Sequence, residues 1–350
     1  MHHHIVVLEG IHMPIPTFPI PAPHTATQTS YPTTSAADLR ERILDATIII
    51  GMPTINFTAE ILSPSITPKL RFIATLGVGT DNIDLKACEE RGIGVSNTPG
   101  ANTDAVAEHV IALYFAARKS VPQMHNRTMA GEWKASKSLT RYMRDADGVW
   151  PITLREEVCG IVGYGAIGKR VAELMKALGM QVIVSGRKGV VVEGESDEIE
   201  SVDLKNPKRV SFGKLLKVAT TLVVVCPKTT ETLNLISTEE LQAMRRNALV
   251  VNVSRGGIVD EAAMTKALNE KQIAGYATDV FDVEPSDQND TPLLRDLADD
   301  ANFVASPHVA WFSELTRLNL TRMLTENVQR FLAGEAQQNI IVKGLLGPEK

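Results

Sequence analysis

The chain has few cysteines and few aromatic residues, and neither sign of charge dominates. Of its 350 residues 3 are cysteines, and aromatic residues make up 5%. Cys88, Cys159 and Cys226 lie far apart and match no Cys-x-x-Cys pattern, which argues against a disulfide framework or a structural zinc site. We therefore expect no metal centre, and a reducing compartment, the cytoplasm, as the location.

Long hydrophobic runs and an excess of basic residues are also missing. No uninterrupted apolar run approaches the ~20 residues of a membrane span, and a net charge of -5 predicts no nucleic-acid partner. Hydrophobic residues at 44% and charged residues at 22% are instead typical of a globular protein. At roughly 100–200 residues per domain, a chain of this length predicts two domains.

The N-terminal region carries many prolines and a run of histidines. Six prolines between residues 14 and 32 break any helix there, since each removes an amide donor. The pattern predicts a strand over residues 5–8 and then a proline-rich surface loop, to which we assign no role. We interpret His2, His3 and His4 as the solvated start of that strand rather than as a metal-binding tract.

Short apolar runs alternate with helical patterns through most of the chain, which predicts parallel sheets with helices on both faces. We expect strands at residues 5–8, 47–50, 70–75, 93–96, 158–162, 181–184, 222–226, 249–252, 274–279 and 303–305. The clearest helices are expected at residues 38–46, 103–118 and 166–178. The helix 103–118 is apolar around most of its circumference, which indicates burial at a domain junction or a subunit interface. The charged, aperiodic segment 193–209 predicts a solvated loop without an assigned role.

The strongest local motif is Gly163-Tyr-Gly165-Ala-Ile-Gly168, which follows an apolar strand and opens an amphipathic helix. Gly163 permits the tight turn, Gly165 lets the backbone approach a pyrophosphate, and Gly168 allows the helix to pack closely on the strand. The amides and dipole at the start of a helix stabilise phosphate charge. A plain strand–helix turn is the alternative, but this context favours a dinucleotide site.

The next strand lacks the acidic residue that would bind the ribose 2′-hydroxyl of NAD. It ends instead in Ser185-Gly186-Arg187-Lys188. A guanidinium can bind a 2′-phosphate through two parallel hydrogen bonds, whereas a carboxylate would repel it. We therefore expect Ser185, Arg187 and Lys188 to bind the 2′-phosphate, with NADP(H) favoured and NAD(H) possible. The alternative is that Arg187 and Lys188 are simply solvated surface cations.

Three polar residues, Arg255, Glu284 and His308, each follow an apolar strand. The carboxyl ends of strands in a doubly wound sheet share one crevice, so these side chains can converge there. An arginine can hold the carboxylate of a 2-keto acid and polarise its carbonyl oxygen. A histidine, with an unperturbed pKa of about 6.5, is the natural proton donor near neutral pH, and a glutamate behind it would fix the ring and favour its protonated form.

The order of these segments resembles the D-isomer-specific 2-hydroxyacid dehydrogenase family over roughly residues 45–342. The matching stretches are Gly77–Asp84, Asn97–Gly100, Asn102–His109, the glycine motif, the Arg255 segment, Asp279–Pro285 and Pro307–His308. Arg187 in place of an acid resembles the NADPH-using glyoxylate and hydroxypyruvate reductases. The resemblance implies a doubly wound parallel Rossmann domain, inserted into a smaller, discontinuous, flavodoxin-like α/β substrate domain. We expect the Rossmann domain at residues 103–307 and the substrate domain at residues 1–102 and 308–350.

The resemblance also implies the roles of individual residues. His308 would be the general acid/base with Glu284 as its partner and Arg255 as the substrate anchor. The amides of Val78 and Gly79 would hold the substrate carboxylate, and Trp311 could line the pocket. The expected cofactor-binding set is Thr103, Gly163, Gly165, Ala166, Ile167, Gly168, Ser185, Arg187, Lys188, Cys226, Pro227, Val253 and Asp279. Family members are usually homodimers through the region of helix 103–118, in which His109 is expected to be structural.

Two other readings of the same residues stay open. Corepressors of the C-terminal-binding-protein type share the fold and the Arg/Glu/His set, and bind the dinucleotide to control assembly. Formate dehydrogenases carry glutamine where Glu284 stands, whereas phosphite-oxidising enzymes keep all three residues. The sequence does not define which 2-keto acid is preferred.

Overall fold

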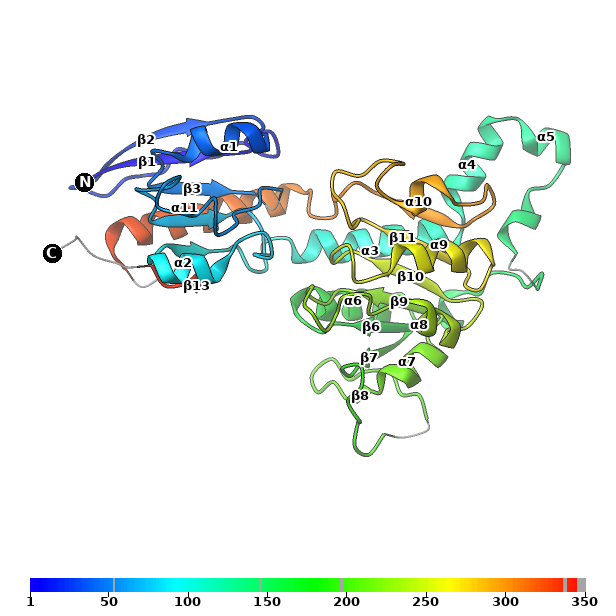
Figure 1. The fold of residues 1–350 in the computed structure, drawn as a ribbon. Coiled ribbons are helices and arrows are strands. Elements are labelled where there is room, and N and C mark those ends of the chain that lie inside the picture. Colours follow the sequence, from blue (N-terminus) through cyan, green and yellow to red (C-terminus); the bar gives the residue numbers. More distant parts are fainter. Residues whose placement is uncertain (53, 145–146, 196–197, 336–338, 345–350) are drawn as a thin grey trace. The chain divides into compact units, whose positions relative to one another are not determined.

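The computed structural model describes residues 1–52, 54–144, 147–195, 198–335 and 339–344, and the chain divides into two compact units. The first unit comprises Met1–Asn102 and Phe312–Lys350, and the second is Thr103–Trp311 (Figure 1). We expected the second domain to end at residue 307. Because the unit instead ends at Trp311, His308 lies in the same unit as Arg255 and Glu284.

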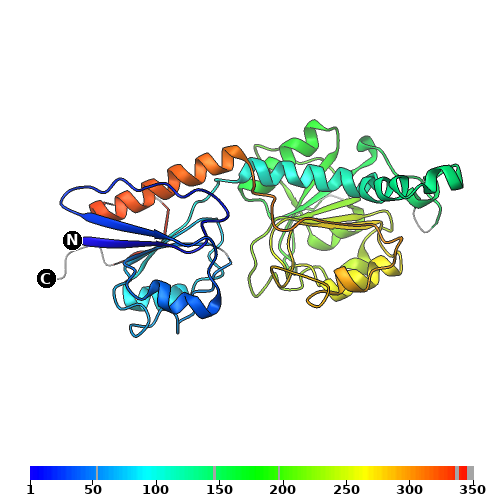
Figure 2. The same cartoon turned by 90° about the horizontal axis from the view of Figure 1, so that it is seen from above.

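The described part of the first unit forms a six-stranded sheet in the order β13-β5-β4-β3-β1-β2. Its strands are β1 (His2–Val7), β2 (Thr25–Ser30), β3 (Ile48–Gly51), β4 (Phe72–Thr75), β5 (Gly94–Ser96) and β13 (Ile340–Val342). All pairs are parallel except β13 with β5. Helix α11 (Glu314–Ala333) covers one face, and α1 (Ala36–Ile43) and α2 (Leu85–Arg91) cover the other (Figure 2). The order 2-1-3-4-5 is the flavodoxin-like one.

The described part of the second unit forms a seven-stranded, fully parallel sheet in the order β12-β11-β10-β9-β6-β7-β8. Its strands are β6 (Val158–Val162), β7 (Gln181–Ser185), β8 (Arg209–Val210), β9 (Thr221–Val224), β10 (Leu249–Asn252), β11 (Gly275–Thr278) and β12 (Phe303–Ala305). The strand order reverses between β6 and β9, which is where doubly wound sheets bind ligands. The predicted fold class is confirmed.

Helices line both faces of this second sheet. They are α3 (Thr103–Arg118), α6 (Ala166–Ala177), α7 (Phe212–Val218), α8 (Thr238–Ala243) and α9 (Glu261–Asn269). Helices α4 (Val121–Met129) and α5 (Glu132–Ser136) continue from α3, α10 (Pro292–Arg295) packs on α9, and 3-10 turns lie at Thr140–Met143 and Leu154–Glu156. Nowhere in the described ranges does a helix have both the length and the apolar composition needed to cross a membrane.

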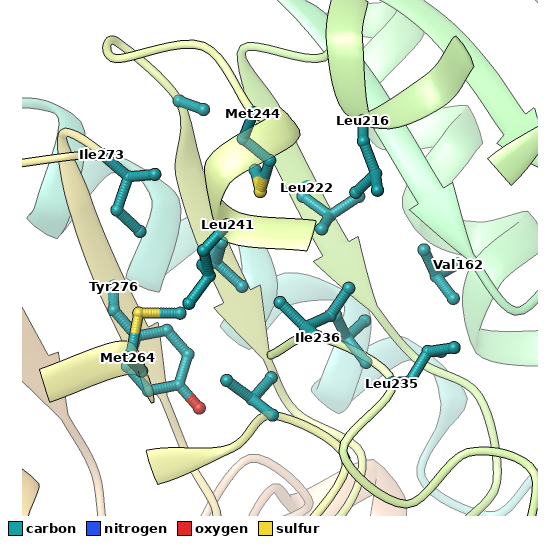
Figure 3. Packing of buried hydrophobic residues seen from close by; sticks show 14 of the residues in the cluster. Val162, Leu216, Leu222, Leu235, Ile236, Leu241, Met244, Met264, Ile273 and Tyr276 are labelled. Atoms are coloured by element: carbon teal, nitrogen blue, oxygen red, sulfur yellow. The ribbon is translucent and has the colours of Figure 1, made fainter. Parts of the chain in front are cut away.

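Two apolar clusters pack against the two faces of the second sheet. One includes Leu216, Leu222 and Leu241 beneath α7, α8 and α9 (Figure 3). The other joins the sheet to α3 and α6. Val250 belongs to the first cluster and its neighbour Val251 to the second, so β10 is buried on both sides. Such double burial explains why these strands read as unbroken apolar runs.

Helix α3 has the bounds that the sequence predicts, and its apolar side chains pack within the second unit. Val106, Val110, Leu113 and Tyr114 are all buried in the cluster that α3 shares with α6 and the sheet. The helix packs on α6, β10 and β11. The burial of these side chains therefore requires neither a domain junction nor a subunit interface.

The N-terminal prediction is wrong in two respects. The proline-rich segment contains β2, which pairs in parallel with β1 from His2 opposite Thr25 to Val7 opposite Ser30. Its sequence, TATQTS, has no apolar alternation because it is a half-exposed edge strand. His3 is 2% exposed rather than solvated, with its Nε2 2.9 Å from Nδ1 of His24. Burial first, and then the neighbouring positive charges, lower the pKa of His3 to about 4.

Candidate active site

The glycine motif forms an open cradle at the start of α6. Gly163 has a φ of 98°, and a Cβ there would lie 2.6 Å from the amide nitrogen of Cys226. A Cβ on Gly168 would lie 2.1 Å from the carbonyl oxygen of Gly163, so α6 can approach β6 only without a side chain. A Cβ on Gly165, in contrast, would meet no atom within 4 Å. Gly165 is the N-cap of α6 and provides no side-chain cap, so the first amides at Ala166 and Ile167 face open space.

The polar residues at the end of β7 differ in their partners. The Ser185 hydroxyl is buried and donates to the Gly186 carbonyl oxygen at 2.6 Å. Arg187 is exposed, and no described residue forms an ion pair with its guanidinium. Lys188 is ion-paired with the buried Glu240, with Nζ 2.7 Å from Oε1. Of the three residues expected at a 2′-phosphate, Arg187 is therefore the one with a free charge.

The loop after β10 carries Arg255 and packs closely against the loop after β11. A Cβ on Gly256 would lie 1.9 Å from the carbonyl oxygen of Phe281, so the two loops touch through their backbones. The Arg255 guanidinium donates to the Ser254 carbonyl oxygen at 2.9 Å, and its positive charge acts on the Glu284 carboxylate. Two segments that are distant in sequence therefore present Arg255 and Glu284 together.

Glu284 and His308 form a direct pair in the second unit. Oε2 of Glu284 lies 2.5 Å from Nδ1 of His308, and the Phe281 amide donates to Oε1 at 2.8 Å. Burial raises the pKa of the Glu284 carboxyl, but the hydrogen bond and charge of His308, the Phe281 amide and the Arg255 charge outweigh it and lower that pKa below its ordinary value. Glu284 is therefore ionised at neutral pH, and Nε2 of His308 does not take part in the pair.

Asp279 holds the backbone that carries His308. This buried carboxylate accepts hydrogen bonds from the Ser306 hydroxyl at 2.6 Å and from the amides of Val309 and Ala310 at 3.0 and 2.8 Å. The Ser306 hydroxyl also lies 2.8 Å from Nε2 of His109. His308 has a φ of 52°, a conformation that non-glycine residues rarely adopt, and these bonds hold the segment around it.

The remaining expected residues of the second unit lie at the same end of the sheet. Cys226 and Pro227 follow β9, Val253 follows β10, and Thr103 is the first residue of α3. The indole N–H of Trp311 donates to the His308 carbonyl oxygen at 3.0 Å. Trp311 therefore supports the His308 backbone directly.

Val78 and Gly79 lie in the first unit, in the loop after β4. The side-chain amide of Asn97 donates to the Val78 carbonyl oxygen at 2.7 Å, and the Thr98 hydroxyl accepts from the Gly77 amide at 3.0 Å. Across the described residues, the amides of Val78 and Gly79 donate no hydrogen bond. Two free amides in a fixed loop suit an anion.

Sequence reasoning missed Glu261, the first residue of α9. Its side chain is buried, accepting from the Asp282 amide at 2.8 Å and from the Thr291 hydroxyl at 2.5 Å. Burial raises the pKa of this carboxyl. Glu261 thus ties the end of the Arg255 loop to the loop of Glu284. The only available signal was an acidic pair, Asp260-Glu261, at a helix start, which is normally read as capping.

Comparisons with known proteins identify the family and the fold. Residues 111–310 match the model of the D-isomer specific 2-hydroxyacid dehydrogenase NAD binding domain. A glyoxylate reductase of Korarchaeum cryptofilum is 36% identical over 304 residues, which cover 86% of this chain and 84% of the relative. The D-lactate dehydrogenase of Aquifex aeolicus, solved with NAD and lactic acid, superposes with a TM-score of 0.73 at 26% identity, covering 92% of this chain and 93% of that one. An NADPH-dependent glyoxylate/hydroxypyruvate reductase of Sinorhizobium meliloti, solved with NADP and malonate, shares the fold with a TM-score of 0.74 at 24% identity over 99% of both chains.

Proposed function

The chain belongs to the D-isomer specific 2-hydroxyacid dehydrogenase family of NAD(P)-dependent oxidoreductases, and we propose that it reduces a small 2-keto acid to the D-2-hydroxy acid, preferring NADPH. The observation that carries this proposal is the Glu284–His308 pair next to the Arg255 loop. It joins a proton donor, its carboxylate partner and a guanidinium at the carboxyl end of one sheet.

The residues of the second unit fit a dinucleotide. The space at Gly165 and the uncapped start of α6 suit a pyrophosphate, which backbone amides bind well at a helix N-terminus. A bound nicotinamide dinucleotide supplies the hydride for the reduction. We propose that Cys226, Pro227, Val253, Thr103 and Asp279 border it at the ends of their elements. Because the carboxylate of Asp279 is already engaged by Ser306, Val309 and Ala310, its first role is to position the His308 segment.

His308 is the proposed general acid. Its Nδ1 is held by Glu284, so Nε2 remains to donate a proton to the keto oxygen as the carbonyl carbon is reduced. The ionised Glu284 stabilises the protonated imidazole, and the ring takes up a proton from solvent after the product leaves. In the reverse reaction the same nitrogen accepts the proton of the hydroxyl group. General acid catalysis of this kind contributes about 10²–10⁴-fold to a rate.

Arg255 is the proposed substrate anchor. A guanidinium binds a carboxylate through two charge-assisted hydrogen bonds and draws electron density from the adjacent carbonyl oxygen. We propose that the free amides of Val78 and Gly79, in the first unit, bind a carboxylate, and that Trp311, which supports the His308 backbone in the second unit, lines the substrate pocket.

The proposed preference for NADPH rests on the end of β7. No acidic side chain follows this strand in Ser185-Gly186-Arg187-Lys188, and the Arg187 guanidinium is free of partners among the described residues. Replacing Arg187 with Ala should raise the KM for NADPH by about tenfold, the effect of one hydrogen bond to a charged group, and leave the KM for NADH unchanged. Equal effects on both cofactors would remove Arg187 from the 2′-phosphate site.

The direct test of the proposed function is the oxidation of NADPH and NADH by the purified protein with a panel of 2-keto acids. The panel runs from glyoxylate and hydroxypyruvate to branched and aromatic keto acids. We expect rapid turnover of the smallest members and a clear preference for NADPH. Tight binding of the dinucleotide without turnover of any keto acid would instead favour a dinucleotide-sensing binding protein.

We also propose a homodimer in the cytoplasm. The segment from α4 to the start of β6 exposes Met129, Trp133 and Trp150 at 75%, 61% and 72% of their surfaces. Large apolar side chains in one segment are typical of a protein contact. All three cysteines are free and buried, which suits a reducing compartment. Sedimentation analysis of the wild type and of Trp133→Glu should show a dimer and a monomer respectively, and a monomeric wild type would refute the proposal.

A further inference from the structure

Arg209 lies at the carboxyl end of β7, although it is 24 residues away from Ser185 in the sequence. Strand β8 pairs in parallel with the last residues of β7, with Arg209 opposite Val184 (Figure 1). Its guanidinium donates to the Ser185 carbonyl oxygen at 2.7 Å. The charged loop before β8 therefore returns the chain to the strand end at which dinucleotides bind their ribose.

The three cations around this strand end are not equivalent. Lys188 is neutralised by Glu240, which is itself 7% exposed. Arg209, in contrast, bonds to a neutral carbonyl group, and no carboxylate of the described residues forms an ion pair with it. Because a guanidinium has five donors, one bond to Ser185 leaves the other donors and the full charge for a ligand. Arg187 is similarly unpaired on the neighbouring segment.

The charge of Arg209 also acts on a residue of the glycine cradle. The hydroxyl oxygen of Tyr164, between Gly163 and Gly165, is buried without a hydrogen-bond partner among the described residues. Burial and the charges of Glu173 and Asp203 raise the pKa of Tyr164, whereas the charge of Arg209 acts in the opposite direction.

We propose that Arg209, together with Arg187, binds the phosphate monoester on the ribose 2′-position of the dinucleotide, and that Lys188 does not take part. This inference rests on the proposed use of NADPH and replaces one of the residues expected there. Two guanidinium groups from β8 and from the turn after β7 can hold one phosphate through charge-assisted hydrogen bonds. The loop before β8 then has a function, since it delivers Arg209 to this place.

Calorimetric titration with adenosine 2′,5′-bisphosphate and adenosine 5′-monophosphate tests the inference without catalysis. The wild type should bind the bisphosphate more tightly than the monophosphate. Arg209→Ala should weaken binding of the bisphosphate by about 10- to 100-fold and leave the monophosphate unchanged. Lys188→Gln, which keeps a hydrogen-bond donor for the buried Glu240, is the matched control, and it should change neither affinity by more than about twofold.

The outcomes separate this inference from the proposed function. If the wild type binds both compounds equally, the preference for NADPH itself is wrong. If the wild type and Arg209→Ala both bind the bisphosphate more tightly than the monophosphate, Arg209 does not bind the 2′-phosphate. The proposed preference for NADPH is then unaffected. A loss in Lys188→Gln as large as that in Arg209→Ala would overturn the distinction between the two cations. Should Arg209→Ala fail to fold, Arg209→Gln, which keeps a donor for the Ser185 carbonyl, should show the same selective loss.

Discussion

The two ends of the sheet in the second unit each carry a carboxylate paired with a basic side chain, and the two pairs are built differently. At the amino end of the strands, Arg118 and Glu157 have side chains only 4% and 0% exposed. At the carboxyl end, His308 and Glu284 are 34% and 30% exposed. The first pair is closed to ligands and the second is open to them.

The buried pair is held by hydrogen bonds from several elements. Nε of Arg118 lies 2.6 Å from Oε1 of Glu157, and the guanidinium also donates to the carbonyl oxygens of Asn247 and Thr220. The Glu157 carboxylate accepts from the hydroxyl groups of Tyr114, Thr220 and Thr221. The network joins α3 to the strand starts, and because both charged side chains are closed to solvent and ligands, its role is structural.

The open pair leaves Nε2 of His308 without a hydrogen bond to any residue that the structure describes. Glu284 uses its two oxygens for His308 and the Phe281 amide, whereas Nε2 of His308 is not part of the pair. The comparison teaches that exposure of the pair to a ligand, rather than the presence of an ion pair, distinguishes a site of proton transfer from a purely structural pair. Changes at one end should therefore affect activity, and changes at the other should affect stability.

The largest expected effect comes from His308→Ala. Turnover of a keto acid should fall by about 10²–10⁴-fold, because general acid catalysis is lost. Binding of NADPH and the thermal unfolding temperature should stay unchanged, since His308 is partly exposed. Steady-state kinetics and differential scanning fluorimetry measure both. Retained turnover would exclude His308 as the acid.

The next effect concerns the buried pair. Glu157→Ala leaves the Arg118 charge buried without its partner, which typically costs about 3–5 kcal/mol of unfolding free energy. Urea unfolding measures this loss, and Tyr114→Phe, which removes one hydrogen bond, is the matched control at about 1 kcal/mol. The folded fraction of Glu157→Ala should keep its normal KM for the keto acid. An unchanged midpoint of urea unfolding would show that the Arg118–Glu157 pair does not stabilise the fold.

Arg255→Ala should chiefly weaken binding of the keto acid. Loss of a charge-assisted anchor corresponds to about 1.5–3 kcal/mol, or roughly 10- to 100-fold in KM. The KM for NADPH should not change. A normal keto-acid KM in this variant would count against the anchor role.

Glu284→Gln should give the smallest loss of keto-acid turnover at the pH optimum, about tenfold. The amide can still form a hydrogen bond with Nδ1 of His308, but the negative charge of the carboxylate is removed. Without the carboxylate the protonated ring is less stable, so the alkaline limb of keto-acid reduction should move to lower pH. The pH dependence of kcat/KM measures this shift. A profile that does not move would show that Glu284 and His308 are not coupled.

The lowered pKa of Glu284 also makes the stability of the fold depend on pH. Because its pKa is lower in the folded protein, ionised Glu284 stabilises the fold above its ordinary value of 4.5, and this contribution is lost as pH falls through the lowered value. The difference in unfolding free energy between the wild type and Glu284→Gln should therefore shrink on acidification below pH 4.5. A difference that is independent of pH would contradict the assignment.

Much of this arrangement could be predicted from the sequence, because it depends on local signals. The bounds of α3, β6, β10 and β12 agree with the predictions, since unbroken apolar runs and helical periodicity mark buried elements. The three glycines of the cradle are required at their positions by contacts that a Cβ would make or by space that it would fill.

The features that the sequence patterns do not predict depend on contacts between segments that are distant in the chain. Strand β2 has no apolar pattern because it is an edge strand, and its pairing with β1 stabilises a sequence of weak strand character. The ion pair between Lys188 and Glu240 likewise joins the turn after β7 to α8. Arg209 and Glu261 reach their positions through β8 and α9, which residue spacing alone does not reveal.

The central claim is that the open pair at the carboxyl end of the second sheet reduces a 2-keto acid. The most direct measurement is the amount and configuration of glycerate formed from hydroxypyruvate and NADPH by the wild type and by His308→Ala. The account predicts D-glycerate from the wild type in an amount equal to the NADPH consumed, and almost none from the variant. Equal product from both proteins, L-glycerate, or no product from the wild type would contradict it.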